Sequence, residues 1–293
     1  MSRSPNYDMK KRRARRYTQI GIYIGFKLFH ISVHLRPSLL QRLYAEFSGG
    51  PMPVLLISGG TRGIGWGVIQ AFAAAGWAVS TCYHEDEASA AEAKTQLAKL
   101  TSDFLILKAD VTQSDEVNAW VTATRDRFST IDCVIHNAGF TRNARVMNVE
   151  EADWDATLSV HLKACFLISK ACLRPMLRQG GHLIFISSVV ATTGNPGQVS
   201  YASAKAGLIG LARSLAREYG SKNIRVNVVC PGFHKTRLSD GLTPEAEEAI
   251  RAKHLLPVTT DLREVEQFML WLASSRSISG QVFNLDSRIP GWL

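Results

Sequence analysis

The sequence predicts an α/β protein with a single Rossmann-type domain: a doubly wound parallel sheet of seven strands with helices on both faces. Short apolar runs alternate with helical patterns from residue 53 to residue 285, as expected of a parallel sheet covered on both sides. A glycine-rich turn joins the first apolar run to the first helical pattern. The chain has 293 residues, of which 46% are hydrophobic, and this is enough to bury one core of that size.

The expected strands are the apolar runs at 53–58, 78–83, 103–108, 131–136, 182–187, 224–229 and 281–285. The stretches between them carry strong helix formers, as in ASAAEAKTQLAKL. The expected helices are 63–75, 88–100, 114–128, 151–178, 199–220 and 262–274, with a further helical segment within 237–257. Because ligands of such sheets lie beyond the carboxyl ends of the strands, the residues that follow each strand form the candidate site.

The turn after the first strand carries glycines at positions 59, 63 and 65. A glycine turn between a strand and a helix lets backbone N–H groups and the helix N-terminus approach a pyrophosphate. The spacing reads GxxxGxG and differs from the GxGxxG of other dinucleotide sites. The turn therefore predicts a dinucleotide at this edge of the sheet.

The string YASAK places Tyr201 four residues before Lys205, with Ser188 upstream. Residues four apart share one face of a helix, so the phenol and the ammonium can act on the same small volume. A nearby positive charge favours the phenolate and lowers the pKa of a tyrosine, and Ser188 is then suited to bind a carbonyl oxygen. On its own, the same spacing is also typical of an amphipathic surface pair.

The GxxxGxG turn, HNAG at 136–139, Ser188, YASAK and Pro231-Gly232 occur in an order that resembles the short-chain dehydrogenase/reductase family. The resemblance runs from residue 53 to about residue 285, and GNPGQVSYASAKAGLIGLARSLARE with IRVNVVCPGF is most similar to the 3-oxoacyl-acyl-carrier-protein reductases. It implies an NADP-dependent oxidoreductase that converts a ketone to a secondary alcohol. Tyr201 would be the proton donor, Ser188 would position the carbonyl oxygen, and Lys205 would lower the pKa of the tyrosine and bind the ribose.

The resemblance also implies which residues bind the cofactor. No carboxylate ends the second strand, where Cys82, Tyr83 and His84 stand, and Arg62 lies in the glycine turn. This charge suits a 2′-phosphate, so we expect NADP(H) rather than NAD(H), although Glu85 and Asp86 follow closely. The expected cofactor-binding residues are Gly59, Thr61, Arg62, Gly63, Ile64, Gly65, His84, Asp110, Val111, Asn137, Ala138, Gly139, Tyr201, Lys205, Pro231, Gly232 and Thr236. Read alone, Asn-Ala-Gly at 137–139 is also an ordinary turn.

Two features depart from the family pattern. His161 stands in the phrase VHL, where relatives commonly have Asn supporting a water that connects the lysine to solvent. An imidazole both donates and accepts hydrogen bonds, so we expect His161 to serve the proton relay with a pH dependence of its own, or else to mark a change of packing. The chain ends in SGQVFNLDSRIPGWL, where relatives end with a D-G-G phrase, and the oligomer contacts made by this tail are expected to differ.

The net charge of +9 is concentrated in residues 1–51, which hold ten Lys and Arg against two acidic residues. We divide the chain into this basic extension and a domain at 52–293. The extension is interpreted as a mis-assigned start or a dispensable tail, or else as a peripheral membrane anchor. A membrane-spanning helix is not expected there, because the apolar run of the extension is too short to cross a bilayer. The five cysteines are expected to be reduced core residues of a cytoplasmic protein, and no His or Cys spacing indicates a metal site, His182 and His254 included.

Three functions remain open on the sequence. The first is NADPH-dependent reduction of a 3-oxoacyl thioester, on acyl carrier protein or coenzyme A, in fatty acid biosynthesis. The second is the same chemistry on a free ketone or hydroxy compound, and the third is a cofactor-binding interaction protein without turnover. Arg174, Arg178 and Lys222 are candidates for an acidic carrier, or else scattered solubilising charge. We expect a homotetramer or homodimer, no nucleic acid, and membrane contact only through residues 1–51.

Overall fold

A computed structural model describes residues 52–236, 239 and 242–288 of the chain. These residues form one sheet of seven parallel strands in the order β3-β2-β1-β4-β5-β6-β7, which confirms the predicted fold class. The strands are β1 (Val54–Ser58), β2 (Ala78–Tyr83), β3 (Phe104–Lys108), β4 (Cys133–His136), β5 (Gly181–Ile186), β6 (Ile224–Cys230) and β7 (Val282–Asn284). The basic extension lies outside the described residues.

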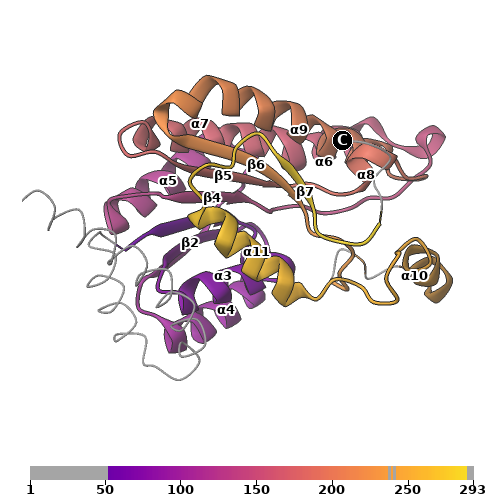
Figure 1. The fold of residues 1–293 in the computed structure, drawn as a ribbon, viewed down its shortest axis with the longest axis horizontal. Helices are drawn as coiled ribbons and strands as arrows, with labels where there is room; N and C mark the ends of the chain where they lie inside the picture. The colour runs from indigo at the N-terminus through magenta and orange to yellow at the C-terminus, as the bar shows by residue number, and fades with distance from the viewer. Residues whose placement is uncertain (1–51, 237–238, 240–241, 289–293) are drawn as a thin grey trace, which may run out of the picture.

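Helices cover both faces of the sheet (Figure 1). One face is covered by α5 (Ser114–Phe128), α6 (Glu151–Leu158), α7 (Ala164–Met176) and α9 (Val199–Tyr219), and the other by α3 (Gly63–Ala74), α4 (Glu87–Leu100) and α11 (Leu262–Ser274). Successive residues of a strand point to opposite faces. Leu56 accordingly packs in the core beneath α5 and α7, whereas Leu55 and Ile57 pack in the core beneath α3 and α11. This two-sided burial explains the continuous apolar runs.

The helix expected at 151–178 is interrupted by a π-helical turn, Ser159–Lys163, which joins α6 to α7. In the described part of the chain, Glu151–Met176 is the one helical stretch long and apolar enough to cross a membrane. It packs against the sheet instead, with Ile168, Cys172 and Met176 fully buried. All five cysteines are buried and none is bonded to another, as expected of core residues.

All strands run in the same direction, so their carboxyl ends meet at one edge of the sheet. The strand order reverses between β1 and β4, and a crevice for a ligand is expected at that point. Within the segment expected to be helical, the structure has one helix, α10 (Pro244–Arg251), which begins at the N-cap Thr243. The remaining short elements are η1 (Val146–Asn148), α8 (Val190–Thr193) and η3 (Gly220–Lys222).

Candidate active site

The glycine turn brings the ends of β1 and β4 together. Gly59 has a φ of +66°, and a Cβ placed on it would lie 2.9 Å from the Cα of Ala138. A Cβ on Gly65 would lie 2.4 Å from the carbonyl oxygen of Gly59 and 2.5 Å from Nδ2 of Asn137. Any side chain at these two positions would therefore fill the turn or collide with its backbone.

Asn137 holds the turn in place. Its Nδ2 donates to the carbonyl oxygen of Gly59 at 2.8 Å, and its backbone N–H donates to Oγ of Ser58 at 3.1 Å. The backbone N–H of Ala138 donates to the same hydroxyl at 3.1 Å. Asn137 and Ala138 thus line the turn by bonding to it, and the amide of Asn137 is already occupied by these bonds.

Helix α3 begins at Gly63 with no side-chain cap and no acidic residue in its first turn. The first N–H groups of a helix have no partner within it and carry partial positive charge. The glycine turn that leads into α3 has glycine at two positions where a side chain does not fit, Gly59 and Gly65. The N-terminal end of α3 fits the diphosphate of a dinucleotide. Thr61 and Ile64 flank the turn and are partly buried.

The end of β2 carries the residues expected to recognise the ribose. Nη1 of Arg62 lies 2.7 Å from Oδ2 of Asp86, so this carboxylate faces the arginine predicted to bind a 2′-phosphate. Asp86 also caps α4, since its Oδ1 accepts from the backbone N–H of Ser89 at 3.0 Å. Arg62 is half exposed, and its guanidinium retains donors for a further anion.

Asp110 and Val111 follow β3, and His84 follows β2. Burial alone would raise the pKa of Asp110, but two hydrogen bonds from Thr112 and the nearby His84 lower it overall. Val111 is buried in the core, and His84 is exposed. The three residues lie at the same edge of the sheet as the glycine turn, because parallel strands β2 and β3 end side by side.

Tyr201 and Lys205 lie one turn apart on α9, and Ser188 follows β5. The Ser188 hydroxyl lies near enough to the Tyr201 phenol to lower its pKa. Nζ of Lys205 lies 5.6 Å from the centroid of the Tyr201 ring and donates to the carbonyl oxygen of Ile186 at 2.6 Å. The structure thus brings the three predicted catalytic residues together at the carboxyl ends of β5 and β6.

Burial governs the charges of this cluster. It raises the pKa of Tyr201 to about 12, and the nearby Ser188 hydroxyl offsets only part of that rise. It also lowers the pKa of Lys205 to about 8. The expectation that Lys205 lowers the pKa of the phenol is therefore not met by the protein groups alone, because desolvation of the phenolate outweighs the opposing effects.

Ser187 is directed away from the phenol. Its hydroxyl is buried and donates to the backbone carbonyl of Lys205 at 2.9 Å. This bond fixes the end of β5 to the middle of α9. Ser188 is consequently the serine at this strand end whose hydroxyl reaches Tyr201, as strand alternation predicts.

His161 lies in the π-helical turn and is 1% exposed. Its ring packs edge-on against the Tyr201 ring with centroids 5.0 Å apart. Nε2 lies 2.7 Å from the carbonyl oxygen of Phe140 and 3.2 Å from its backbone nitrogen. The shorter distance favours the tautomer in which Nε2 carries the proton and donates to the carbonyl.

Burial, followed by the charge of Lys205, lowers the pKa of His161 to about 3. The imidazole is therefore neutral over the working pH range, and its Nδ1 is buried without a hydrogen-bond partner. A Cβ placed on Gly139 would lie 2.3 Å from Cε1 of His161. Gly139 thus makes room for the ring that fixes the loop after β4 against Tyr201.

The turn after β6 lies across the site from the glycine turn. Pro231 is buried, Gly232 has a φ of +92°, and a Cβ on Gly63 would lie 3.6 Å from Cγ2 of Thr236. The backbone N–H of Thr236 donates to Oγ of Ser239 at 2.9 Å. The two ends of the cofactor site expected from the sequence are therefore neighbours in the fold.

Two contributors were missed by the sequence reasoning. Phe140 bonds to His161 through its backbone, and its ring lies 5.6 Å from the imidazole between centroids. Asp286 packs beneath Gly232, with its Cβ 2.9 Å from where a Cβ on Gly232 would stand. A backbone contact leaves no signal in residue type. For Asp286, the one available signal was the departure of the C-terminal phrase from the family pattern.

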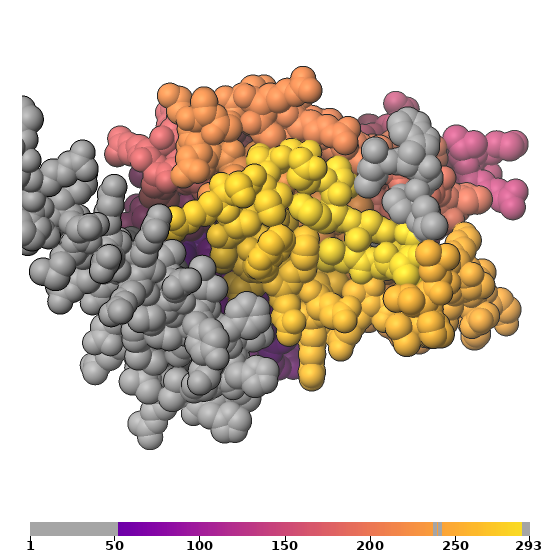
Figure 2. All heavy atoms as spheres, viewed as in Figure 1, coloured from indigo at the N-terminus to yellow at the C-terminus, as the bar shows by residue number. Residues whose placement is uncertain are grey.

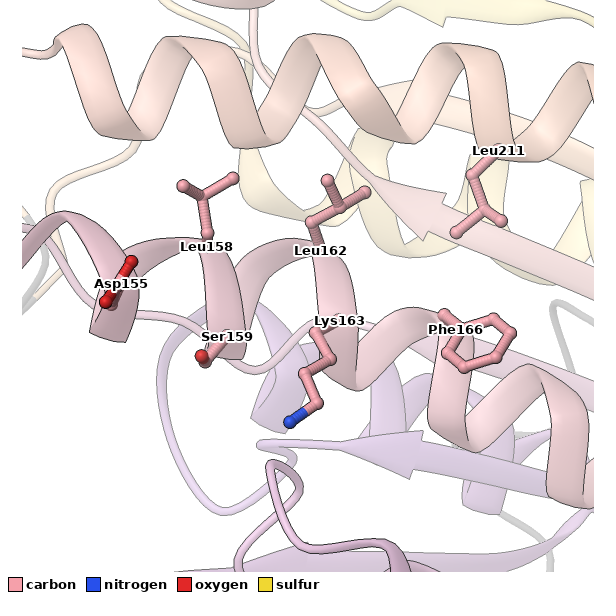
Figure 3. Close-up of a pocket in the computed structure, with 7 residues that line it drawn as sticks. All are labelled: Asp155, Leu158, Ser159, Leu162, Lys163, Phe166 and Leu211. Atoms are coloured by element: carbon pink, nitrogen blue, oxygen red, sulfur yellow. The ribbon is translucent and has the colours of Figure 1, made fainter.

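Figure 3 shows a shallow recess between α6, the π turn, α7 and α9 that holds none of the predicted catalytic residues. Leu158 and Leu162 point towards α9, from which Leu211 faces them, and Phe166 stands beside the opening. This surface lies on the outer side of the helices. It is lined by Asp155, Leu158, Ser159, Leu162, Lys163, Phe166 and Leu211.

The basic residues proposed for a carrier lie elsewhere. Arg178 follows the end of α7 and Lys222 lies in η3, near the edge where β5 and β6 begin, and Arg174 is in the last turn of α7. Tyr201 lies at the opposite edge, where the strands end. All three are exposed, and they do not border the Tyr201 site of the same chain. Within the described ranges, no group of three or more His, Cys, Asp or Glu is placed to hold a metal ion.

Comparison with known proteins gives one matching family model and several relatives. Residues 59–287 match the family model described as enoyl-(acyl carrier protein) reductase. The chain is 37% identical over 235 residues to the 3-oxoacyl-[acyl-carrier-protein] reductase FabG of Chlamydia muridarum, covering 79% of this chain and 94% of the relative. It is 34% identical over 238 residues to FabG of Thermotoga maritima, covering 80% and 96%. It is 33% identical over 234 residues to the 3-oxoacyl-[acyl-carrier-protein] reductase of Synechocystis, covering 80% and 95%.

Proposed function

Because the chain belongs to the short-chain dehydrogenase/reductase family of nicotinamide-dependent oxidoreductases, we propose that it reduces a 3-oxoacyl thioester to the 3-hydroxyacyl thioester with NADPH. The observation that carries the proposal is the juxtaposition of Ser188 and Tyr201, with Nζ of Lys205 5.6 Å from the centroid of the tyrosine ring. The relatives' names supply the substrate class, since all those cited above are 3-oxoacyl-carrier reductases.

When bound, the nicotinamide supplies the hydride. The protein supplies the proton and the positions of the reacting groups. Tyr201 is protonated at neutral pH because burial raises its pKa to about 12, so it holds the proton that the carbonyl oxygen needs as negative charge develops. Ser188 turns its hydroxyl from the phenol to the same oxygen and fixes the ketone between them. Lys205 orients the tyrosine and holds the ribose of the cofactor.

The preference for NADP(H) is part of the proposal. Arg62, in the turn between β1 and α3, is half exposed and lies beside Asp86, which follows β2. A guanidinium binds a phosphate more strongly than it binds a hydroxyl. Asp86 opposes this preference because its carboxylate repels a 2′-phosphate. Asp86 accepts two hydrogen bonds from Ser89, one from the backbone N–H and one from the hydroxyl at 2.8 Å, and these bonds hold its carboxylate at the N-cap of α4.

The carrier, the assembly and the location are proposals as well. We propose that the acyl group arrives on acyl carrier protein or coenzyme A, that the enzyme acts in the cytoplasm, and that it forms a homodimer or homotetramer. The apolar recess of Figure 3 supports an oligomer, since Phe166 is 48% exposed beside it. Arg178 and Lys222 lie at the opposite edge of the sheet from Tyr201, so a carrier bound there would not border the Tyr201 site of the same chain.

Tyr201→Phe tests the assignment of the proton donor. We expect kcat for acetoacetyl thioester to fall at least about a hundredfold, because general-acid catalysis contributes this much, with the NADPH Kd changed little. Ser203→Ala, on the same helix and exposed, is the matched control. A Tyr201→Phe enzyme that kept a tenth of the activity would refute the role.

A substrate panel tests the rest of the proposal. Purified protein is assayed for NADPH oxidation with acetoacetyl-coenzyme A, the corresponding carrier-bound thioester and simple cyclic ketones. Turnover of a thioester well above that of the cyclic ketones supports the proposal. Turnover of free ketones alone would show that the substrate is a free ketone rather than a thioester. NADPH binding without any turnover would indicate a cofactor-binding interaction protein.

A further inference from the structure

A buried cluster of charged side chains joins the C-terminal segment to the residues after α10. His254 and Asp286 have side chains 1% and 0% exposed, and Nε2 of His254 lies 3.7 Å from Oδ2 of Asp286. Nδ1 of His254 lies 3.0 Å from the carbonyl oxygen of Ile250, the last but one residue of α10. Nδ1 therefore faces a carbonyl oxygen, and Nε2 lies beside the Asp286 carboxylate without a hydrogen bond.

Asp286 is also bonded within its own segment. Its Oδ1 accepts from the backbone N–H of Arg288 at 2.9 Å, and its Oδ2 accepts from Nε of Arg288 at 2.7 Å and from Nη2 of the same guanidinium. Nδ2 of Asn284 donates to the carbonyl oxygen of Arg288 at 2.9 Å. A carboxylate removed from water is stabilised only by such charged and polar partners.

The same segment fastens the chain that follows α10 at three more points. Oγ1 of Thr260 donates to the carbonyl oxygen of Leu285 at 2.6 Å. The backbone N–H groups of Leu255 and Leu256 donate to the carbonyl oxygen and to Oγ of Ser287, at 3.4 and 3.2 Å. In Figure 2 the C-terminal segment, in yellow, lies against the orange segment that carries α10.

Asp286 lies directly beneath the turn expected to hold the nicotinamide. A Cβ on Gly232 would lie 2.9 Å from Cβ and 3.2 Å from Oδ2 of Asp286. The backbone N–H of Leu285 donates to the carbonyl oxygen of Cys230, which precedes this turn, at 2.9 Å. One carboxylate therefore contacts the turn after β6 and, through His254, the end of α10.

We propose that Asp286 is a positioning residue that locks the α10 segment, residues 242–260, to the turn at Pro231 and Gly232, and that this lock shapes the substrate side of the site. The inference rests on the proposed function, because it assigns to the α10 segment a role in holding the ketone substrate. Three apolar side chains in this segment, Leu255, Leu256 and Val258, are 70%, 58% and 64% exposed. They lie where the lock fixes the backbone.

Asp286→Asn tests the lock because asparagine keeps the size and removes the charge. We expect the KM for acetoacetyl thioester to rise about tenfold, since hydrogen bonds to charged groups are among the stronger ones, with kcat and the NADPH Kd changed less than about threefold. Trypsin should cut after Arg251 or Lys253 about tenfold faster, because both residues are exposed at the end of α10. His254→Asn, which removes only the α10 side of the lock, should raise the same cleavage rate.

Asp261→Asn is the matched control. Asp261 is exposed and caps α11 through the backbone N–H of Arg263 at 2.9 Å, a role that asparagine also performs. A lower Tm in Asp286→Asn with unchanged KM and unchanged cleavage would overturn the proposal, and so would equal effects in Asp261→Asn. The cleavage assay needs no turnover. If no thioester is reduced, the proposed function fails while cleavage still decides whether the lock exists.

Discussion

Gly139→Ala is the substitution whose effect follows most directly from the geometry. Gly139 has no positive φ, so an alanine strains no backbone angle there. The added Cβ would lie 2.3 Å from Cε1 and 2.9 Å from Nδ1 of His161. Ordinary contacts between carbon atoms are about 3.5 to 4.0 Å, so the ring would have to retreat by about 1.2 Å or more.

The ring has little freedom to retreat. Nε2 is bonded to the carbonyl oxygen of Phe140 at 2.7 Å, and the ring lies edge-on against Tyr201. Overpacking of a filled site costs about 1 to 3 kcal/mol. About 2 kcal/mol lowers the Tm of a domain of this size by about 4 to 8 °C. Displacement of the ring beside Tyr201 should also reduce kcat about tenfold or more, because errors of about 1 Å in position are costly.

The assay is a double-mutant cycle with His161→Asn, read by thermal unfolding and by kcat. Asparagine lacks the distal ring atoms, so Gly139→Ala should cost at least about 0.5 kcal/mol less in the His161→Asn background. Gly210→Ala is the control, because a Cβ at this position in α9 meets nothing within 4 Å. It should leave activity unchanged and raise stability slightly. Equal costs of Gly139→Ala in both backgrounds would refute the reasoning.

Three further predictions concern charge. Arg62→Ala should raise the KM for NADPH about tenfold and leave that for NADH nearly unchanged, and equal effects on both cofactors would exclude a 2′-phosphate contact. The pKa of Lys205, lowered to about 8 by burial, predicts that kcat/KM for NADPH falls above about pH 8. Because this folded-state pKa lies below the ordinary lysine value of 10.5, the contribution of Lys205 to the free energy of unfolding should rise between about pH 8 and pH 10.5 relative to Lys205→Met. A difference that does not change with pH would contradict this prediction. His161→Asn should lower kcat without shifting either limb of the pH–rate profile, since burial lowers the pKa of His161 to about 3. A shift of either limb would support a role for His161 in the proton relay.

Most of the fold was predictable because it is encoded locally. Leu55, Leu56 and Ile57 form a run that is apolar on both faces, which only a doubly covered strand requires. The glycine turn was recognisable in the sequence because Gly59 and Gly65 stand at positions where no side chain fits. The spacing of Tyr201 and Lys205 predicted a shared helix face, and Nζ of Lys205 does lie 5.6 Å from the centroid of the Tyr201 ring.

What the sequence could not reveal depends on pairs far apart in the chain. Gly232 and Asp286 touch across 54 positions, and His254, which follows α10, lies beside Asp286 across 32 positions. The π-helical turn at 159–163 was likewise invisible, because the pattern around it is an ordinary helical one. The pairing of Arg62 with Asp86 joins the glycine turn to the N-cap residue of α4, and these two residues lie 24 positions apart in the chain.

The proposed mechanism predicts that reduction proceeds at a lower pH than oxidation. Burial favours the neutral form of both proposed catalytic groups, raising the pKa of Tyr201 to about 12 and lowering that of Lys205 to about 8. A protonated phenol is ready to donate to a carbonyl, whereas oxidation of an alcohol needs the phenolate, which the protein groups alone do not stabilise at neutral pH. The positive charge of an oxidised nicotinamide is the remaining means of stabilising that phenolate. Oxidation of a 3-hydroxyacyl thioester should therefore require a higher pH than reduction of the 3-oxoacyl thioester.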